Sequence, residues 1–159
     1  MRRIGVYIFL LTLGFSCIEY PEYPPEPRVE YISAIPYIRE DELGNQEKTI
    51  RLTFMLYDGD GDIGHGQTEP TKRDFYSTFY VQKDGVFHLL SDFIADSSNY
   101  TLPQLRAENN TKFIKAEVQI DIAHSSLSFP YDTVSFSFYV QDRAGNTSNK
   151  DSSDLIIFR

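Results

Sequence analysis

The sequence predicts an all-β protein in which antiparallel strands form a sandwich. One observation is the composition, because 12 Phe and 11 Tyr occur in 159 residues without a single Trp, and aromatic residues favour strands. Another is the alternation of apolar and polar residues that recurs from residue 29 onward, whereas no segment has helical periodicity. The third is spacing, since about seven short strands in roughly 130 residues are typical of an immunoglobulin-like β-sandwich. The predicted domain is residues 29–159.

The predicted strands are residues 30–38, 48–57, 75–82, 86–90, 115–122, 133–141 and 155–158. The clearest, residues 48–57, has apolar residues at every even position from 50 to 56, a pattern that predicts one buried face. Two later strands alternate in the same way. Pro36 places the first strand at an edge, because proline cannot donate to a central ladder. Asp84-Gly85 predicts a tight hairpin between the third and fourth strands, since this pair accepts positive φ angles.

The N-terminal segment, residues 1–16, has the pattern of a signal peptide. Two arginines precede residues 4–15, which carry no charge and are too few to span a hydrocarbon core of about 30 Å as a helix. Ser16 and the only cysteine, Cys17, follow at once, and a small residue before a lone cysteine resembles the lipobox of bacterial lipoproteins. That resemblance implies cleavage before Cys17 and its acylation. The alternative is an ordinary signal peptide that leaves Cys17 as a free thiol.

Residues 17–28 are expected to be the lipidated cysteine and a tether. Residues 18–28 contain four prolines in eleven positions, and such density favours an extended polyproline II spacer. A proline-rich segment can also be a ligand for a peptide-recognition domain, although a spacer is the simpler interpretation directly after a lipidation site. The predicted location is therefore the cell envelope, at the outer membrane, held there by the lipid.

The charge of the chain excludes several partners. The formal net charge is −8 and no basic cluster is present, whereas nucleic-acid recognition needs concentrated positive charge. Cleavage before Cys17 would remove two arginines, so −8 becomes −10. An anionic body is not attracted to an anionic membrane, so attachment depends on the lipid chains. A single cysteine also excludes an intrachain disulfide and a zinc site built on several thiolates.

Residues 58–64 read DGDGDIG and follow directly on the strand of residues 48–57. Asp58, Asp60 and Asp62 stand at alternate positions, and the glycines between them let the backbone curl so that several oxygens face one point. A cation of the size of Ca²⁺ needs such an arrangement of oxygens. We therefore expect Asp58, Asp60 and Asp62 to bind one Ca²⁺ in a structural role. An EF-hand is excluded because Ile63 stands where that loop requires glycine. The alternative is that these residues only form a turn.

Residues 142–149 read DRAGNTSN and directly follow the strand of residues 133–141. In a sandwich of this strand order, the loops after the second and sixth strands lie at the same end. Asp142 or Asn146 is therefore expected to complete the cation shell begun by the first loop. The alternative is a β-turn with Gly145 in a strained conformation and no metal.

The two loop motifs together carry a resemblance. A strand followed by DGDGDIG, an aromatic hairpin, a strand followed by DRAGNTSN and a closing strand resembles a family of uncharacterised Bacteroidota lipoproteins with immunoglobulin-like domains. The resemblance covers most of residues 48–158. It implies a periplasmic or surface-exposed lipoprotein and supplies no catalytic residues.

The pattern of histidines argues against an enzyme. His65, His88 and His124 are scattered without a zinc-ligand spacing, and neither a Gly-x-Ser-x-Gly motif nor a phosphate-binding glycine loop is present. The leading hypothesis is a non-enzymatic binding or structural module. The alternative is a metal-assisted hydrolase that uses the acidic loop with His65, the only candidate acid or base beside it.

Two surface features remain. If the apolar residues of the third strand face the core, Tyr76 and Tyr80 face outward, and Tyr139 on a neighbouring strand extends them into a stripe. Tyrosines suit recognition surfaces, so an envelope protein or a glycan is the expected partner, unless residues 91–110 cover this face. Asp132-Thr133-Val134 resembles the acceptor motif for O-glycosylation of Bacteroidota exported proteins. The alternative is that Thr133 only begins a strand.

Overall fold

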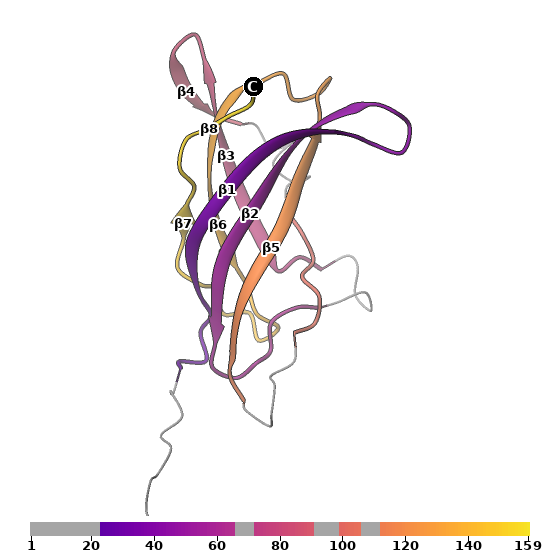
Figure 1. Ribbon diagram of the computed structural model, residues 1–159. Helices are drawn as coiled ribbons and strands as arrows, with labels where there is room; N and C mark the ends of the chain where they lie inside the picture. The colour runs from indigo at the N-terminus through magenta and orange to yellow at the C-terminus, as the bar shows by residue number, and fades with distance from the viewer. Residues whose placement is uncertain (1–22, 66–71, 91–98, 106–111) are drawn as a thin grey trace, which may run out of the picture.

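The computed structural model describes residues 23–65, 72–90, 99–105 and 112–159, which form a β-sandwich without helices (Figure 1). The strands are β1 (Arg28–Glu40), β2 (Gln46–Asp58), β3 (Phe75–Lys83), β4 (Val86–Leu89), β5 (Ile114–Ser125), β6 (Thr133–Val140), β7 (Asp151–Ser152) and β8 (Ile156–Ile157). The predicted all-β class and antiparallel sandwich are therefore confirmed. Each predicted strand is present, and β7 is an additional one.

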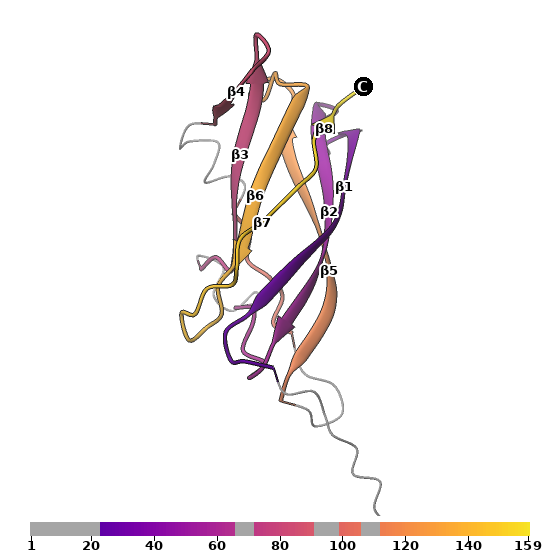
Figure 2. The ribbon, with the colours of Figure 1, turned by 90° about the vertical axis from the view of Figure 1, so that its left-hand side faces the viewer.

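The strands form two antiparallel sheets that face each other (Figure 2). One sheet has the order β1-β2-β5. In the other, β3 lies between β4 and β6, and both β7 and β8 pair with β6. β1 is an edge strand, as Pro36 predicted. The β3–β4 hairpin has positive φ angles of 51° at Asp84 and 81° at Gly85, which confirms the predicted tight turn.

Aromatic side chains fill the space between the sheets. Phe54 on β2 lies 5.2 Å from Phe138 on β6 between ring centroids, and Phe75 on β3 lies 5.7 Å from the same ring. All three are buried, and complete burial of such a side chain contributes about 1.5–3 kcal/mol. β2 and β6 thus bury the faces that their alternation predicted.

β5 departs from its predicted pattern. Its alternation predicts one buried face, yet of four apolar residues on that face only Ile122 is buried, while Ala116, Val118 and Ile120 are half-exposed. The reason is that β5 is the other edge of its sheet. Its free side borders a groove of about 460 Å³ that residues 100–105 line from the opposite side.

The two loops with the acidic motifs lie at one end of the sandwich, together with the described N-terminal residues. The described chain enters β1 at this end, β2 ends there, and the loop after β6 returns there, whereas the C-terminus lies at the opposite end (Figures 1 and 2). Tyr23–Pro27, predicted as part of the tether, lie against this end, and Pro27 is buried. Within the described ranges, no helix is long and apolar enough to cross a membrane.

Candidate metal centre

The loop after β2 curls back on its own first residue. Asp58 is the last residue of β2 and its side chain is fully buried. The backbone N–H of Asp62 donates to Oδ2 of Asp58 at 2.8 Å. Gly61 and Gly64 have φ angles of 72° and 89°, which glycine adopts without strain. The glycines of DGDGDIG therefore allow the backbone to turn Asp62 toward Asp58.

The loop after β6 positions Asp142 through a local turn. The backbone N–H of Asn146 donates to Oδ1 of Asp142 at 2.7 Å, and its side-chain amide donates to Oδ2 at 2.8 Å. Gly145 closes the turn with a φ of 92°. Asp142 is 2% exposed. These hydrogen bonds orient the buried carboxylate of Asp142, so both N–H donors of Asn146 are directed at Asp142.

Hydrogen bonds join the two loops. The backbone N–H of Ala144 donates to Oδ2 of Asp62 at 3.0 Å, and that of Arg143 donates to the carbonyl of Asp62 at 3.2 Å. The guanidinium of Arg143 donates to the carbonyl of Gly64 at 3.3 Å. The expectation that both loops lie at one end of the sandwich is therefore confirmed in the structure.

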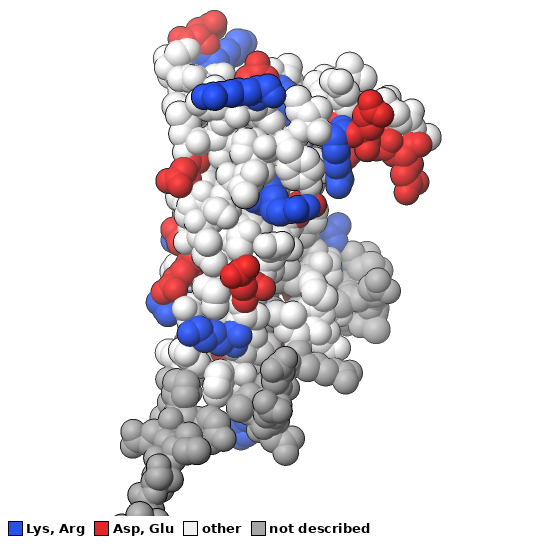
Figure 3. Space-filling model, in the orientation of Figure 1, with Lys and Arg blue, Asp and Glu red and all other residues white. Residues whose placement is uncertain are grey.

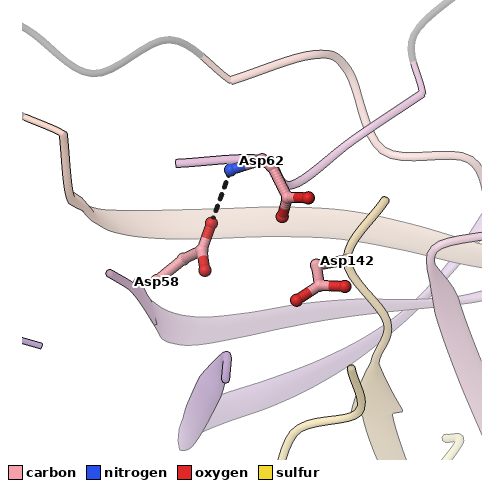
Figure 4. A group of neighbouring side chains, drawn as sticks. All are labelled: Asp58, Asp62 and Asp142. Atoms are coloured by element: carbon pink, nitrogen blue, oxygen red, sulfur yellow. Dashed lines mark hydrogen bonds between the residues drawn. The ribbon is translucent and has the colours of Figure 1, made fainter. Parts of the chain in front are cut away.

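Three carboxylates meet where the loops join (Figure 4). Asp58, Asp62 and Asp142 each contribute an oxygen, and these three oxygens lie within 4.8 Å of one another. Oδ1 of Asp58 and Oδ1 of Asp62 are buried and have no hydrogen-bond partner. An unpaired buried carboxylate oxygen is costly, and a cation between the three side chains would remove that cost.

The pKa values of these aspartates also favour a cation between them. Burial, and then the negative charge of Asp60, raises the pKa of Asp58 to about 6. Burial, and then the charge of Asp142, raises the pKa of Asp62 as well. Both shifts show that the ionised carboxylates are unfavourable in this environment. Positive charge would stabilise them, and the hard oxygen donors match Ca²⁺.

Of the five residues predicted to bind the metal, three belong to this group. Asp60 is exposed and lies outside it, although its charge acts on Asp58 and Asp62. Asn146 donates its amide to Asp142. Alternation along the loop identified the acidic residues but could not tell which of them face inward.

A buried pair, His65 and Asp74, is the feature that the sequence did not reveal. Nδ1 of His65 bonds Oδ1 of Asp74, whose other oxygen accepts the backbone N–H groups of His65 at 3.2 Å and Leu102 at 2.9 Å. Asp74 is fully buried and the His65 side chain is 9% exposed. His65 is thus held in place by Asp74. No local pattern signals the pair, because nine positions separate the two residues in the sequence.

The predicted tyrosine stripe lies on the outer face of the β3–β6 pair. Tyr76 and Tyr139 are cross-strand neighbours with stacked rings, 5.0 Å apart and 11° from parallel. Nζ of Lys150 lies 5.6 Å from the Tyr139 ring centroid. Tyr80 is 39% exposed and pairs with Ser135. The three tyrosines therefore share a face, with Tyr80 set apart from the stacked pair.

The two predicted modification sites differ in what the structure describes. Thr133 is the first residue of β6, is half-buried and pairs with Ile157. Cys17 lies outside the described residues.

Comparison of the chain with protein-family models, curated proteins and solved structures found no match.

Proposed function

We propose that the chain is a lipid-anchored protein of the cell envelope whose sandwich is a non-enzymatic binding or structural module stabilised by Ca²⁺. The observation that carries the proposal is the pair of buried, unpartnered oxygens on Asp58 and Asp62, which lie within reach of Asp142. Such an arrangement is costly in a protein that has no cation to place there.

Calcium fits the donors better than other common metals. It takes six to eight oxygen ligands in a flexible shell, so backbone carbonyls and water can add to three carboxylates. One Ca²⁺ against three carboxylates leaves about one negative charge, which such a shell tolerates. Magnesium demands tight octahedral geometry and keeps its waters, and zinc prefers thiolate and imidazole ligands.

The anchor is assigned to Cys17 and the location to the outer membrane. Acidic and basic side chains are interspersed over the β1-β2-β5 face (Figure 3), where Arg51 pairs with Asp121 and Arg39 with Glu47, both at 2.9 Å. The described part of this face carries no basic patch for an anionic bilayer or for nucleic acid, which supports attachment through lipid chains. We also assign the sandwich to the immunoglobulin-like class and the chain to the Bacteroidota lipoproteins that it resembles.

The calcium hypothesis is tested by thermal unfolding of the full chain carrying Cys17→Ser, which removes the acylated residue. Calcium at 100 times its Kd should stabilise the protein by about 2.7 kcal/mol, which is a rise of several degrees in Tm at this size. Titration calorimetry should give one site. An unchanged Tm between excess chelator and millimolar calcium, with no heat of binding, refutes the proposal.

The anchor is tested by fractionation of cells that express either the wild type or Cys17→Ser. The wild type should sediment with membranes and carry acyl chains in its mass spectrum, whereas the variant should be released. A Cys17→Ser protein that stays with the membranes, beside a wild type without acyl chains, contradicts the assignment.

For a partner, we propose that Tyr76, Tyr80 and Tyr139 contact an envelope protein or a glycan. Tyr80→Ala should weaken binding of a component from an envelope extract, and it should leave the Tm in calcium unchanged.

We further propose O-glycosylation at Thr133. The intact mass of the wild type should then exceed that of the bare polypeptide, and the mass of Thr133→Ala should equal it.

A second candidate is a metal-assisted hydrolase, and the His65–Asp74 pair is the observation that favours it. A histidine oriented by a buried carboxylate is a common general base, and it follows directly on the acidic loop. Calcium-dependent hydrolysis of chromogenic phosphate and acetate esters, lost in His65→Ala but retained in His88→Ala, would establish it. We prefer the non-enzymatic function because the His65 side chain is nearly buried.

A further inference from the structure

The N-terminal segment Tyr23–Pro27 is fastened to the acidic loop at Gly59. The backbone N–H of Gly59 donates to the carbonyl of Pro24 at 3.0 Å. A Cβ at Gly59 would lie 2.2 Å from the carbonyl oxygen of Tyr23 and 2.3 Å from that of Pro24. Any other residue at position 59 would therefore displace the segment, because both obstacles are backbone atoms.

Tyr57 on β2 and Phe113, which directly precedes β5, complete the surface that holds the segment, and we call this surface the seat. The ring of Tyr23 lies 5.6 Å from that of Tyr57 and 5.3 Å from that of Phe113, and Pro27 is buried. A cavity of about 340 Å³ lies between the segment and Thr147, in the chain that follows β6. Tyr23–Pro27 is thus in contact with the end of the sandwich.

The seat and the candidate cation site share one stretch of backbone. Tyr57 and Gly59, which contact the segment, stand on either side of Asp58, which contributes an oxygen to the acidic group. The loop is also confined on its other side, because a Cβ at Gly61 would lie 2.6 Å from the carbonyl of Lys112. The Gly59 N–H that holds the segment and the Asp58 carboxylate therefore belong to adjacent residues of one confined loop.

We infer that cation binding controls the docking of Tyr23–Pro27, an inference that rests on the proposed calcium site. With the cation bound, Asp58 and Asp62 hold the loop so that Gly59 presents its N–H to Pro24. Without it, repulsion between three carboxylates opens the loop and the segment detaches. Because Tyr23–Pro27 lies between Cys17 and β1 in the sequence, calcium sets how much chain separates the sandwich from its proposed anchor. By linkage, docking strengthens calcium binding by the same factor.

The absence of tryptophan from the chain makes a specific fluorescence experiment possible. Tyr23→Trp, in the full chain with Cys17→Ser, places a single reporter in the seat. Leu43→Trp is the matched control, because Leu43 is 87% exposed in the β1–β2 turn at the opposite end. Calcium should shift the emission of the Tyr23→Trp protein to shorter wavelength and reduce acrylamide quenching, and should leave the Leu43→Trp protein unchanged.

Gly59→Ala and Tyr23→Ser separate docking from cation binding. At saturating calcium, Gly59→Ala in the Tyr23→Trp protein should abolish the fluorescence response. Tyr23→Ser lies outside the strands, so it leaves the fold intact, and it should weaken calcium binding about fivefold or more in calorimetry. Calcium binding without a response of the Tyr23→Trp protein overturns the inference and leaves the calcium site standing. Absence of calcium binding overturns both.

Discussion

The chain forms the same five-residue turn at opposite ends of the sandwich, at residues 41–45 and 142–146, both with the pattern Asp-x-x-Gly-Asn. In the first, Asn45 donates its backbone N–H and its side-chain amide to the two oxygens of Asp41, at 2.8 and 2.9 Å. In the second, Asn146 donates the same two groups to Asp142, at 2.7 and 2.8 Å. The glycines have φ angles of 81° and 92°. Locally the turns are equivalent.

What differs is the surroundings of the aspartate. Asp41 begins an exposed turn, and the hydrogen bonds from Asn45 lower its pKa. Asp142 is 2% exposed and faces Asp58 and Asp62, whose oxygens lie within 4.8 Å. The pattern therefore specifies a turn in both places. A cation site arises only where tertiary structure brings this turn against a second acidic loop.

The sharpest test of this comparison is the pair Asp142→Asn and Asp41→Asn. Both variants lose a carboxylate that accepts two hydrogen bonds from an asparagine, which weakens the turn. Asp142→Asn also removes the charge that repels Asp58 and Asp62, so in chelator this relief opposes the loss of the turn. Only Asp142→Asn should also lose the stabilisation by calcium, about 2.7 kcal/mol at 100 times the Kd. Thermal unfolding of both variants, with and without calcium, measures this. Equal calcium shifts in the two variants would contradict the proposed role of Asp142.

The next effect is pH dependence, which should have opposite signs for Asp58 and Asp41. The pKa of Asp58 is raised to about 6 by burial and by the charge of Asp60. The native state therefore holds a proton that the unfolded state releases near pH 3.9. In chelator, the wild type should lose stability relative to Asp58→Asn as the pH rises from about 4 to 6, and the difference should then level off.

Asp41 provides the opposite case within the same experiment. Hydrogen bonds from Asn45 lower its pKa, so its contribution to stability is present at neutral pH and is lost as the pH falls below about 4. Urea unfolding of wild type, Asp58→Asn and Asp41→Asn, measured both below pH 4 and between about pH 4 and 6, gives both signs. Parallel profiles for the wild type and Asp58→Asn would mean that the pKa of Asp58 is not raised in the native state.

The sheets were predictable because their signal is local. Alternation in residues 48–57 and 133–141 identifies β2 and β6 with their buried faces, and Asp84-Gly85 identifies the hairpin. β7 escaped prediction because two residues cannot alternate. β7 also contacts a strand that is distant in the sequence. Oδ2 of Asp151 accepts the N–H of Tyr31 at 2.7 Å and so covers part of the β1 edge.

The candidate site was predictable only in outline. The spacing of DGDGDIG shows that carboxylates can converge, and the strand order shows which loop faces them. It does not show that Asp60 points to solvent or that Asn146 orients Asp142, because these depend on the path of the folded backbone. The contact of Tyr23 with the loop was not predictable either, since the proline-rich composition of residues 18–28 indicates only an extended chain.

A smaller effect compares the glycines of the two turns. An alanine Cβ would meet no heavy atom within 4 Å at Gly44 or Gly145, so backbone strain alone determines the cost. Gly44→Ala and Gly145→Ala should therefore each destabilise the chelated protein by about 1–2 kcal/mol, the usual cost of a left-handed conformation with a Cβ. Denaturant unfolding compares them directly. A much larger loss for Gly145→Ala in chelator would mean that its turn carries more than local structure.

The smallest effect concerns Asp60, which is exposed and lies outside the group of three carboxylates. Its charge raises the pKa of both Asp58 and Asp62, so Asp60→Asn relieves repulsion. Without calcium the substitution should therefore stabilise the protein slightly, within the roughly 0.5 kcal/mol typical of surface changes. In calcium the same substitution removes a distant attraction, so the shift in Tm should shrink a little, whereas Asp62→Asn should abolish it. If Asp60→Asn abolishes the shift as well, Asp60 turns inward when the cation binds, and the loop rearranges around the metal instead of presenting a preformed site.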